Sequence, residues 1–149
     1  MSVLCRQAAL RFLKIRPRSV AELKYKLTQK GFEVQEINQT LQWLQNVELL
    51  NDRSFTKAWI NYRLARPFGF RRIITELKAK GVSDEIIEEA IACAKVEYKE
   101  HDVIGELAQR RWRRLPDIES QKKQKRVFDF LLRRGFPVDA IMKVIKNLK

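Results

Sequence analysis

The sequence predicts an all-α protein made of three tandem three-helix repeats, about nine helices in all. Glycine and proline are scarce, with 5 and 4 in 149 residues, which leaves little room for turn-rich β architecture. Apolar residues recur at three- and four-residue steps nearly throughout, the spacing of amphipathic helices. A short string centred on glycine occurs three times, which indicates an internal repeat.

The first repeat shows where its helices are expected to begin and end. Apolar spacing predicts a helix over residues 2–14. Pro17 stops it, because the residue before a proline disfavours the helical conformation. Ser19 and Glu22 form a capping box that opens the second helix, and Gly31 ends that helix in the left-handed conformation. A further apolar stripe predicts the third helix.

The repeat is centred on Gly31, Gly81 and Gly135. Each has leucine four residues earlier, a basic residue just before it and an apolar residue after it. The first two repeats align without a gap at a shift of 50 residues, whereas the third needs four extra residues, which we place around 115–118. Such repeats bury their apolar faces on their neighbours, so we expect an elongated, curved, solenoid-like body. The predicted repeats are 1–50, 51–97 and 98–149.

The charge balance points to a polyanionic partner. Lys and Arg number 31 against 18 Asp and Glu, a formal net charge of +13. Nucleic acid is the first expectation, an acidic protein or anionic membrane the next. Residues 1–65 carry a net +6, residues 66–100 zero and residues 101–149 +7, so positive charge is predicted at the two ends. No apolar run suits a membrane span or a secretory signal, and two cysteines make no disulfide framework. A cytoplasmic protein is expected.

The basic residues form clusters on the predicted helices. Lys122, Arg126 and Arg133 share one helix face, while Val127 and Leu131 lie on another. For a single lysine a solvated surface is the simpler interpretation. The arginine-rich ensemble favours phosphate binding, because released counterions reward it. The candidate binding residues are Arg16, Arg18, Arg63, Arg66, Arg71, Arg72, Arg110, Arg111, Arg113, Arg114, Lys122, Lys123, Lys125, Arg126, Arg133 and Arg134.

Catalytic chemistry has little support in the sequence. The single histidine, His101, has no serine or cysteine partner in a known motif, and its spacing from Cys93 is not that of a metal site. No glycine-rich phosphate loop follows a strand. We expect neither an enzyme nor a cofactor. Four aromatic residues near the basic clusters have helical spacing that is more typical of core than of base stacking: Tyr62, Phe68, Phe70 and Trp112.

Three runs of sequence resemble the RecX family of recombination regulators. They are LNDRSFTKAW at 50–59, RPFGFRRIITELKAKGV at 66–82 and RVFDFLLRRGF at 126–136. Asn51 stands where the family commonly has an acid, and asparagine is also a competent cap or turn residue. The resemblance extends over almost the whole chain, from Cys5 to Leu148.

The resemblance implies a fold of three tandem three-helix repeats and a regulatory role. Members of that family bind the RecA recombinase, chiefly as its filament on single-stranded DNA, and lie in the helical groove of the filament. They suppress its ATP hydrolysis, strand exchange and coprotease activity, which serve DNA repair and the SOS response. Many also bind DNA directly. A monomer that binds the RecA filament and single-stranded DNA, with duplex DNA as a further ligand, is therefore expected, and the sixteen basic residues are its candidate contacts.

Two other classes of function stay open. A helix-turn-helix regulator would place one helix of a repeat in the major groove. The residues after the turns, such as Glu33–Glu36 and Ser83–Glu85, are acidic where a recognition helix is usually basic or amide-rich. A basic single-strand binder without a recombinase partner is the other alternative. A nucleic-acid enzyme lacks the carboxylate or nucleophile arrangement it would need.

Overall fold

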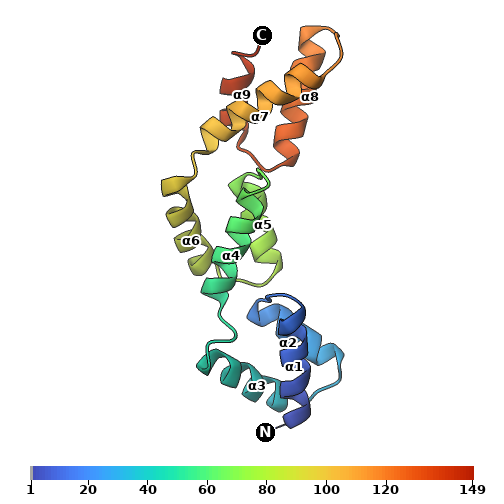
Figure 1. Cartoon of the computed structure of the whole chain (residues 1–149), viewed down its shortest axis with the longest axis vertical. Coiled ribbons are helices and arrows are strands. Elements are labelled where there is room, and N and C mark those ends of the chain that lie inside the picture. Colours follow the sequence, from blue (N-terminus) through green and yellow to red (C-terminus); the bar gives the residue numbers. More distant parts are fainter. Residues whose placement is uncertain (1) are drawn as a thin grey trace. The chain divides into compact units, whose positions relative to one another are not determined.

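The computed structural model describes residues 2–149, and this part of the chain contains nine α-helices and no strand (Figure 1). The all-α class and the arrangement of three helices in three successive repeats are confirmed. The helices are α1 Val3–Ile15, α2 Val20–Gln29, α3 Val34–Asn46, α4 Asp52–Leu64, α5 Phe70–Ala79, α6 Asp84–Glu97, α7 Glu100–Arg114, α8 Ser120–Arg133 and α9 Val138–Ile145.

The three repeat glycines end their helices in the same way. Gly31, Gly81 and Gly135 have φ angles of 85°, 75° and 88°, the left-handed conformation that a C-terminal glycine adopts without a steric penalty. The amide of the residue after each glycine donates to the carbonyl five residues earlier, at 3.4, 3.2 and 3.3 Å. This is the Schellman motif. The repeat therefore has a common local geometry as well as a common sequence string.

Two of the expected helix starts are also present. Ser19 Oγ accepts from the amide of Glu22 at 3.1 Å, and the Glu22 carboxylate accepts from the amide of Ser19 at 3.1 Å, which confirms the capping box. Asn51 Oδ1 accepts from the amides of Arg53 and Ser54 at 2.9 and 3.1 Å. Asparagine thus caps α4 as expected.

Helix α8 is one turn longer than its counterparts, with 14 residues against 10 in α2 and in α5. Helices α5 and α8 begin 50 residues apart, at Phe70 and Ser120. The four extra residues of the third repeat therefore lie within α8, and their predicted place around 115–118 is wrong. Four residues add one helical turn and rotate the following side chains by only about 40°. The apolar face continues undisturbed, so the pattern gave no sign of the insertion.

The chain forms two compact units, which we call unit 1 and unit 2. Unit 1 comprises residues 2–59 and Glu76–Ala90, and unit 2 comprises Ile60–Thr75 and Ile91–Lys149. The boundary falls inside α4, α5 and α6, so the middle repeat contributes to both units. The repeat boundaries at 50/51 and 97/98 stay a prediction from the sequence.

Each unit has its own apolar core. In unit 1 this core comes from α1–α3 and the segment after α3, with Cys5, Ala9, Leu23, Leu27, Ile37, Leu41, Leu44 and Leu50 buried. In unit 2 it comes from α7–α9 and their connections, with Ile104, Leu107, Ala108, Trp112, Val127, Leu131, Phe136, Ile141, Val144, Ile145 and Leu148 buried. Among residues 2–149, no helix is both long enough and apolar enough to cross a membrane.

Candidate anion-binding surface

The positive charge of the protein belongs almost entirely to unit 2. Unit 2 holds 19 basic and 8 acidic residues, a net +11, whereas unit 1 holds 12 and 10, a net +2. Unit 1 is therefore much less basic than the count of +6 over residues 1–65 suggests. The acidic segment Glu76–Ala90 folds with the N-terminal repeat and lowers the net charge of unit 1 to +2. The basic residues of Ile60–Thr75 fold with the C-terminal repeat.

In unit 1, the start of α2 packs on the turn between α5 and α6, and we call this contact the unit 1 joint. Ser19 Oγ donates to the carbonyl oxygen of Lys80 at 2.5 Å. A Cβ atom added at Gly81 would overlap the Cβ of Ala21. The Lys80 ammonium donates to the Glu22 carboxylate at 3.0 Å. The unit 1 joint is thus held by a hydrogen bond from Ser19 and by an ion pair in which the charges of Glu22 and Lys80 cancel.

Glu22 is the electrostatic centre of the unit 1 joint. Burial acts to raise the pKa of its carboxyl, but hydrogen bonds from Arg16, Lys80 and the amide of Ser19, together with the Lys80 charge, outweigh burial and lower that pKa to about 2. Arg16 pairs with it at 3.1 Å. The Lys80 ammonium also lies 4.3 Å from the ring centroid of Trp59.

In unit 2, the start of α5 packs on the turn between α8 and α9, and this is the unit 2 joint. The amide of Gly69 donates to the carbonyl oxygen of Arg134 at 2.7 Å. A Cβ at Gly69 would overlap the backbone of Gly135, and a Cβ at Gly135 would overlap Arg72. Two glycines therefore allow the backbones to approach closely, which explains the glycine in the Pro-Phe-Gly string and the glycine in the Arg-Gly-Phe string.

Arginine and phenylalanine side chains surround the unit 2 joint. The guanidinium carbons of Arg72, Arg63 and Arg134 lie 4.4, 4.9 and 5.4 Å from the ring centroid of Phe68. Arg134 also lies 4.8 Å from the ring of Phe130. These distances are within the range of cation–π attraction. Burial and the nearby charge of Arg72 lower the pKa of Arg134.

Backbone carbonyls fix two of these guanidinium groups. Arg134 Nη1 donates to the carbonyl oxygen of Pro67 at 3.1 Å. Arg72 Nη1 donates to the carbonyl oxygen of Arg133 at 3.3 Å. A stacked and hydrogen-bonded guanidinium loses less rotamer freedom when it binds a ligand, because its orientation is already set.

A groove of about 420 Å³ opens beside the unit 2 joint. We call it the arginine groove. It is lined by Arg71, Arg72, Thr75, Leu132, Arg133, Gly135 and Phe136. Three of these seven residues are arginines with exposed side chains, and none is acidic.

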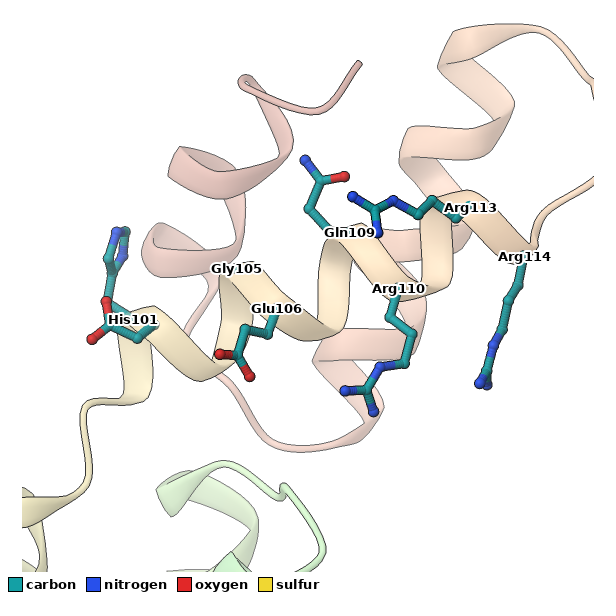
Figure 2. Close-up of a pocket in the computed structure, with 8 residues that line it drawn as sticks. His101, Gly105, Glu106, Gln109, Arg110, Arg113 and Arg114 are labelled. Carbon is teal, nitrogen blue, oxygen red and sulfur yellow. The ribbon is translucent and has the colours of Figure 1, made fainter.

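A second, larger groove of about 930 Å³ runs along one face of α7. It is lined by His101, Asp102, Gly105, Glu106, Gln109, Arg110, Arg113 and Arg114. Figure 2 shows His101 near one end of the helix and Arg114 at the other. In this view Glu106 and Arg110 extend below the helix and Gln109 extends above it. The acids lie near the helix N-terminus and the arginines near its C-terminus, as the helix dipole favours. His101 is exposed.

The sixteen candidate residues divide into groups with different surroundings. Arg63, Arg71, Arg72, Arg133 and Arg134 come together at the unit 2 joint. Three others, Arg110, Arg113 and Arg114, are exposed along α7, and Lys122, Lys125 and Arg126 are exposed on α8. The remaining side chains are turned toward aromatic rings or acids: Arg66 toward Tyr62, Arg111 toward Phe130, Lys123 toward Trp112, Arg18 toward Phe12 and Arg16 toward Glu22.

Unit 1 uses its two candidates for its own structure. Arg18 is half-buried, and its Nε donates to the carbonyl oxygen of Phe12 at 3.4 Å. Burial and the charge of Arg16 lower the pKa of Arg18. Arg16 is held by Glu22.

The expectation of a core position is wrong for two of the four aromatic residues. Phe70 and Trp112 are core, as their spacing indicates, whereas Tyr62 is 50% exposed. Phe68 instead is half-buried beneath three guanidinium groups. Its position between Pro67 and Gly69, flanked by arginines, is the signal that was available.

Fold and surface together define a class: an all-α tandem-repeat protein with one strongly basic unit. Residues 2–149 contain no group of three or more side chains suited to hold a metal ion. Sequence profiles for the first, second and third three-helix domains of RecX match residues 5–44, 51–91 and 99–145. The chain therefore belongs to the RecX family of regulatory proteins, and the resemblance of its motifs is confirmed.

Individual relatives agree with this assignment. The regulatory protein RecX of Clostridium perfringens strain 13 is 32% identical over 146 residues, which are 97% of this chain and 68% of that protein. The same-named protein of Legionella pneumophila strain Corby is 34% identical over 149 residues, 95% of this chain and 93% of that one. The crystal structure of RecX from Lactobacillus salivarius has a TM-score of 0.81 at 24% identity, over 97% of this chain and 94% of that one. It supports the fold.

Proposed function

We propose that this chain binds the RecA recombinase and its filament on single-stranded DNA, lies in the groove of the filament and inhibits ATP hydrolysis, strand exchange and coprotease activity. Membership of the RecX family across all three repeats carries this proposal. The protein acts as a monomer in the cytoplasm, without catalytic chemistry of its own, in recombination, DNA repair and the SOS response.

The charge of unit 2 supports a DNA contact within this function. A net +11 on one compact unit favours a polyanion, because binding releases the counterions condensed on it. Tandem repeats offer several contacts at once, and contacts whose spacing matches a polymer strengthen one another by avidity. Bound across recombinase protomers, the chain would hold them at a spacing unsuited to ATP turnover.

The test is the single-stranded-DNA-dependent ATPase of the cognate recombinase, titrated with this protein at fixed filament concentration. Inhibition far below the concentration that coats the DNA is the expected result. Inhibition only after the free DNA is saturated would contradict the proposal and would favour the second candidate, a basic DNA-binding protein that competes for the lattice without a recombinase partner.

Charge reversal then locates the contacts. Replacing Lys122, Lys125 and Arg126 by Glu should abolish inhibition, because these side chains are exposed and the change turns three positive charges into negative ones that repel a polyanion. Full inhibition by this variant would exclude the α8 surface. Reversal of Arg16 and Arg18 is the weaker test, since both support the fold of unit 1. Circular dichroism checks that each variant is folded.

A further inference from the structure

The arginine groove is a feature that the fold itself does not require. The unit 1 joint is built from the same glycine turn, and the equivalent carbonyl accepts a hydrogen bond there from Ser19 Oγ in place of a backbone amide, so it shows what the joint needs. At a shift of 50 residues, Arg71 and Arg72 correspond to Ala21 and Glu22. At the shift of 54 that relates Gly81 to Gly135, Arg133 corresponds to Ala79. One joint thus packs without any of the three arginines that line the groove of the other.

The groove also has one guanidinium already oriented. Arg72 lies 4.4 Å from the Phe68 ring and donates to the Arg133 carbonyl oxygen at 3.3 Å. Arg71 and Arg133 also line the groove, and both are exposed. Arginine can donate two parallel hydrogen bonds to the oxygens of one phosphate or carboxylate group. Three arginines around a groove of about 420 Å³ therefore suit a bound anion.

The surroundings favour a phosphodiester over the carboxylate of a protein. A polynucleotide carries one negative charge on every nucleotide. A strand in the groove therefore also reaches other basic residues of unit 2, whose net charge is +11, and its binding gains from counterion release. The groove has an apolar wall in Leu132, which is 40% exposed and is free to pack against a sugar.

We propose that the arginine groove binds the phosphodiester backbone of a nucleic acid, with Arg71, Arg72 and Arg133 as its phosphate contacts. This inference rests on the DNA contact in the proposed function and assigns that contact to one site. Arg72 is also a structural residue of the joint. Arg71 and Arg133 are the two positions at which the contact can be removed without disturbing the packing.

The test compares Arg71→Gln/Arg133→Gln with Lys143→Gln/Lys146→Gln. The second pair removes the same charge from exposed positions of unit 2 outside the groove. Binding of a labelled oligothymidylate is measured by fluorescence anisotropy over a range of salt concentrations, with no recombinase present. For single strands, log K falls with log salt by about 0.7 per phosphate contact, so the groove variant should lose about 1.4 from the slope. The control pair should keep the slope.

A duplex of equal length is the second arm. Loss of slope with the oligothymidylate alone assigns the groove to single strands, and loss with both assigns it to any phosphodiester backbone. Arg71→Lys/Arg133→Lys should keep the slope and lose affinity, because lysine retains the charge without the paired donors. Equal slopes for the groove and control variants would overturn the proposal, as would lost ATPase inhibition with unchanged DNA binding, which would assign the groove to a protein partner. Failure of inhibition by the wild-type chain, by contrast, would overturn the proposed function and leave the groove as a DNA site.

Discussion

The two joints share a glycine turn and an accepting carbonyl but differ in their electrostatics. In each, the carbonyl of the residue before a left-handed glycine accepts a hydrogen bond from the residue that precedes a helix. The unit 1 joint places Glu22 between Arg16 and Lys80. The unit 2 joint places Arg72 at the equivalent position, stacked on Phe68. The repeat therefore fixes the accepting carbonyl, whereas the donor is the Ser19 hydroxyl in one joint and the Gly69 amide in the other, and the charged side chains around the contact differ.

The largest expected effect is the loss of stability when a glycine within a joint is replaced, compared with the loss when a glycine outside the joints is replaced. Gly135→Ala must accommodate both a left-handed alanine and an overlap with Arg72, so it should lower the free energy of unfolding by about 3 kcal/mol. Gly31→Ala has the same φ sign but no neighbour within 4 Å, and should cost only about 1 kcal/mol. Urea unfolding of both variants measures the difference. Equal losses would show that the backbone conformation alone, and not the joint, requires glycine.

The next largest effect is the loss of stability when Glu22 of the unit 1 joint is replaced. Glu22→Gln removes a carboxylate that accepts from Arg16 and Lys80, and should cost about 1–2 kcal/mol at pH 7. The pKa of Glu22 is lowered from 4.5 to about 2, so its contribution is present above pH 4.5 and is lost as the pH falls toward 2. Urea midpoints of the wild type and variant should therefore converge between these pH values. A constant difference down to pH 2 would contradict the ion-pair role of Glu22.

The smallest effect is the loss of stability when the Phe68 ring of the unit 2 joint is removed. Phe68→Leu keeps an apolar side chain but removes the ring beneath Arg63, Arg72 and Arg134. It should lower the free energy of unfolding by about 1 kcal/mol, the typical value of a partly exposed cation–π contact. Thermal unfolding measures it. A variant as stable as the wild type would mean that hydrogen bonds to the carbonyls of Pro67 and Arg133 alone hold the guanidinium groups.

The sequence predicted what local chemistry determines. The capping box at Ser19, the asparagine cap at position 51 and the three glycine turns each depend on residues within one turn of each other. The candidate site depends on distant residues, and there the prediction was incomplete. Arg72 and Arg133 meet only because α5 packs on the end of α8. Counting charge along the chain divided the basic residues of unit 2 among all three counted segments and mixed them with the acidic residues of Glu76–Ala90, which fold with unit 1.

The additional turn of α8 has an evolutionary consequence. An insertion of four residues leaves Val127 and Leu131 in the core and lengthens the helix by about 6 Å. Selection can therefore keep or remove a whole turn at the start of this helix with little effect on packing. Insertions of one or two residues would rotate the apolar face out of register. The length of this helix should accordingly vary among homologues by about four residues at a time, and each step would change how far the basic side chains near its start extend.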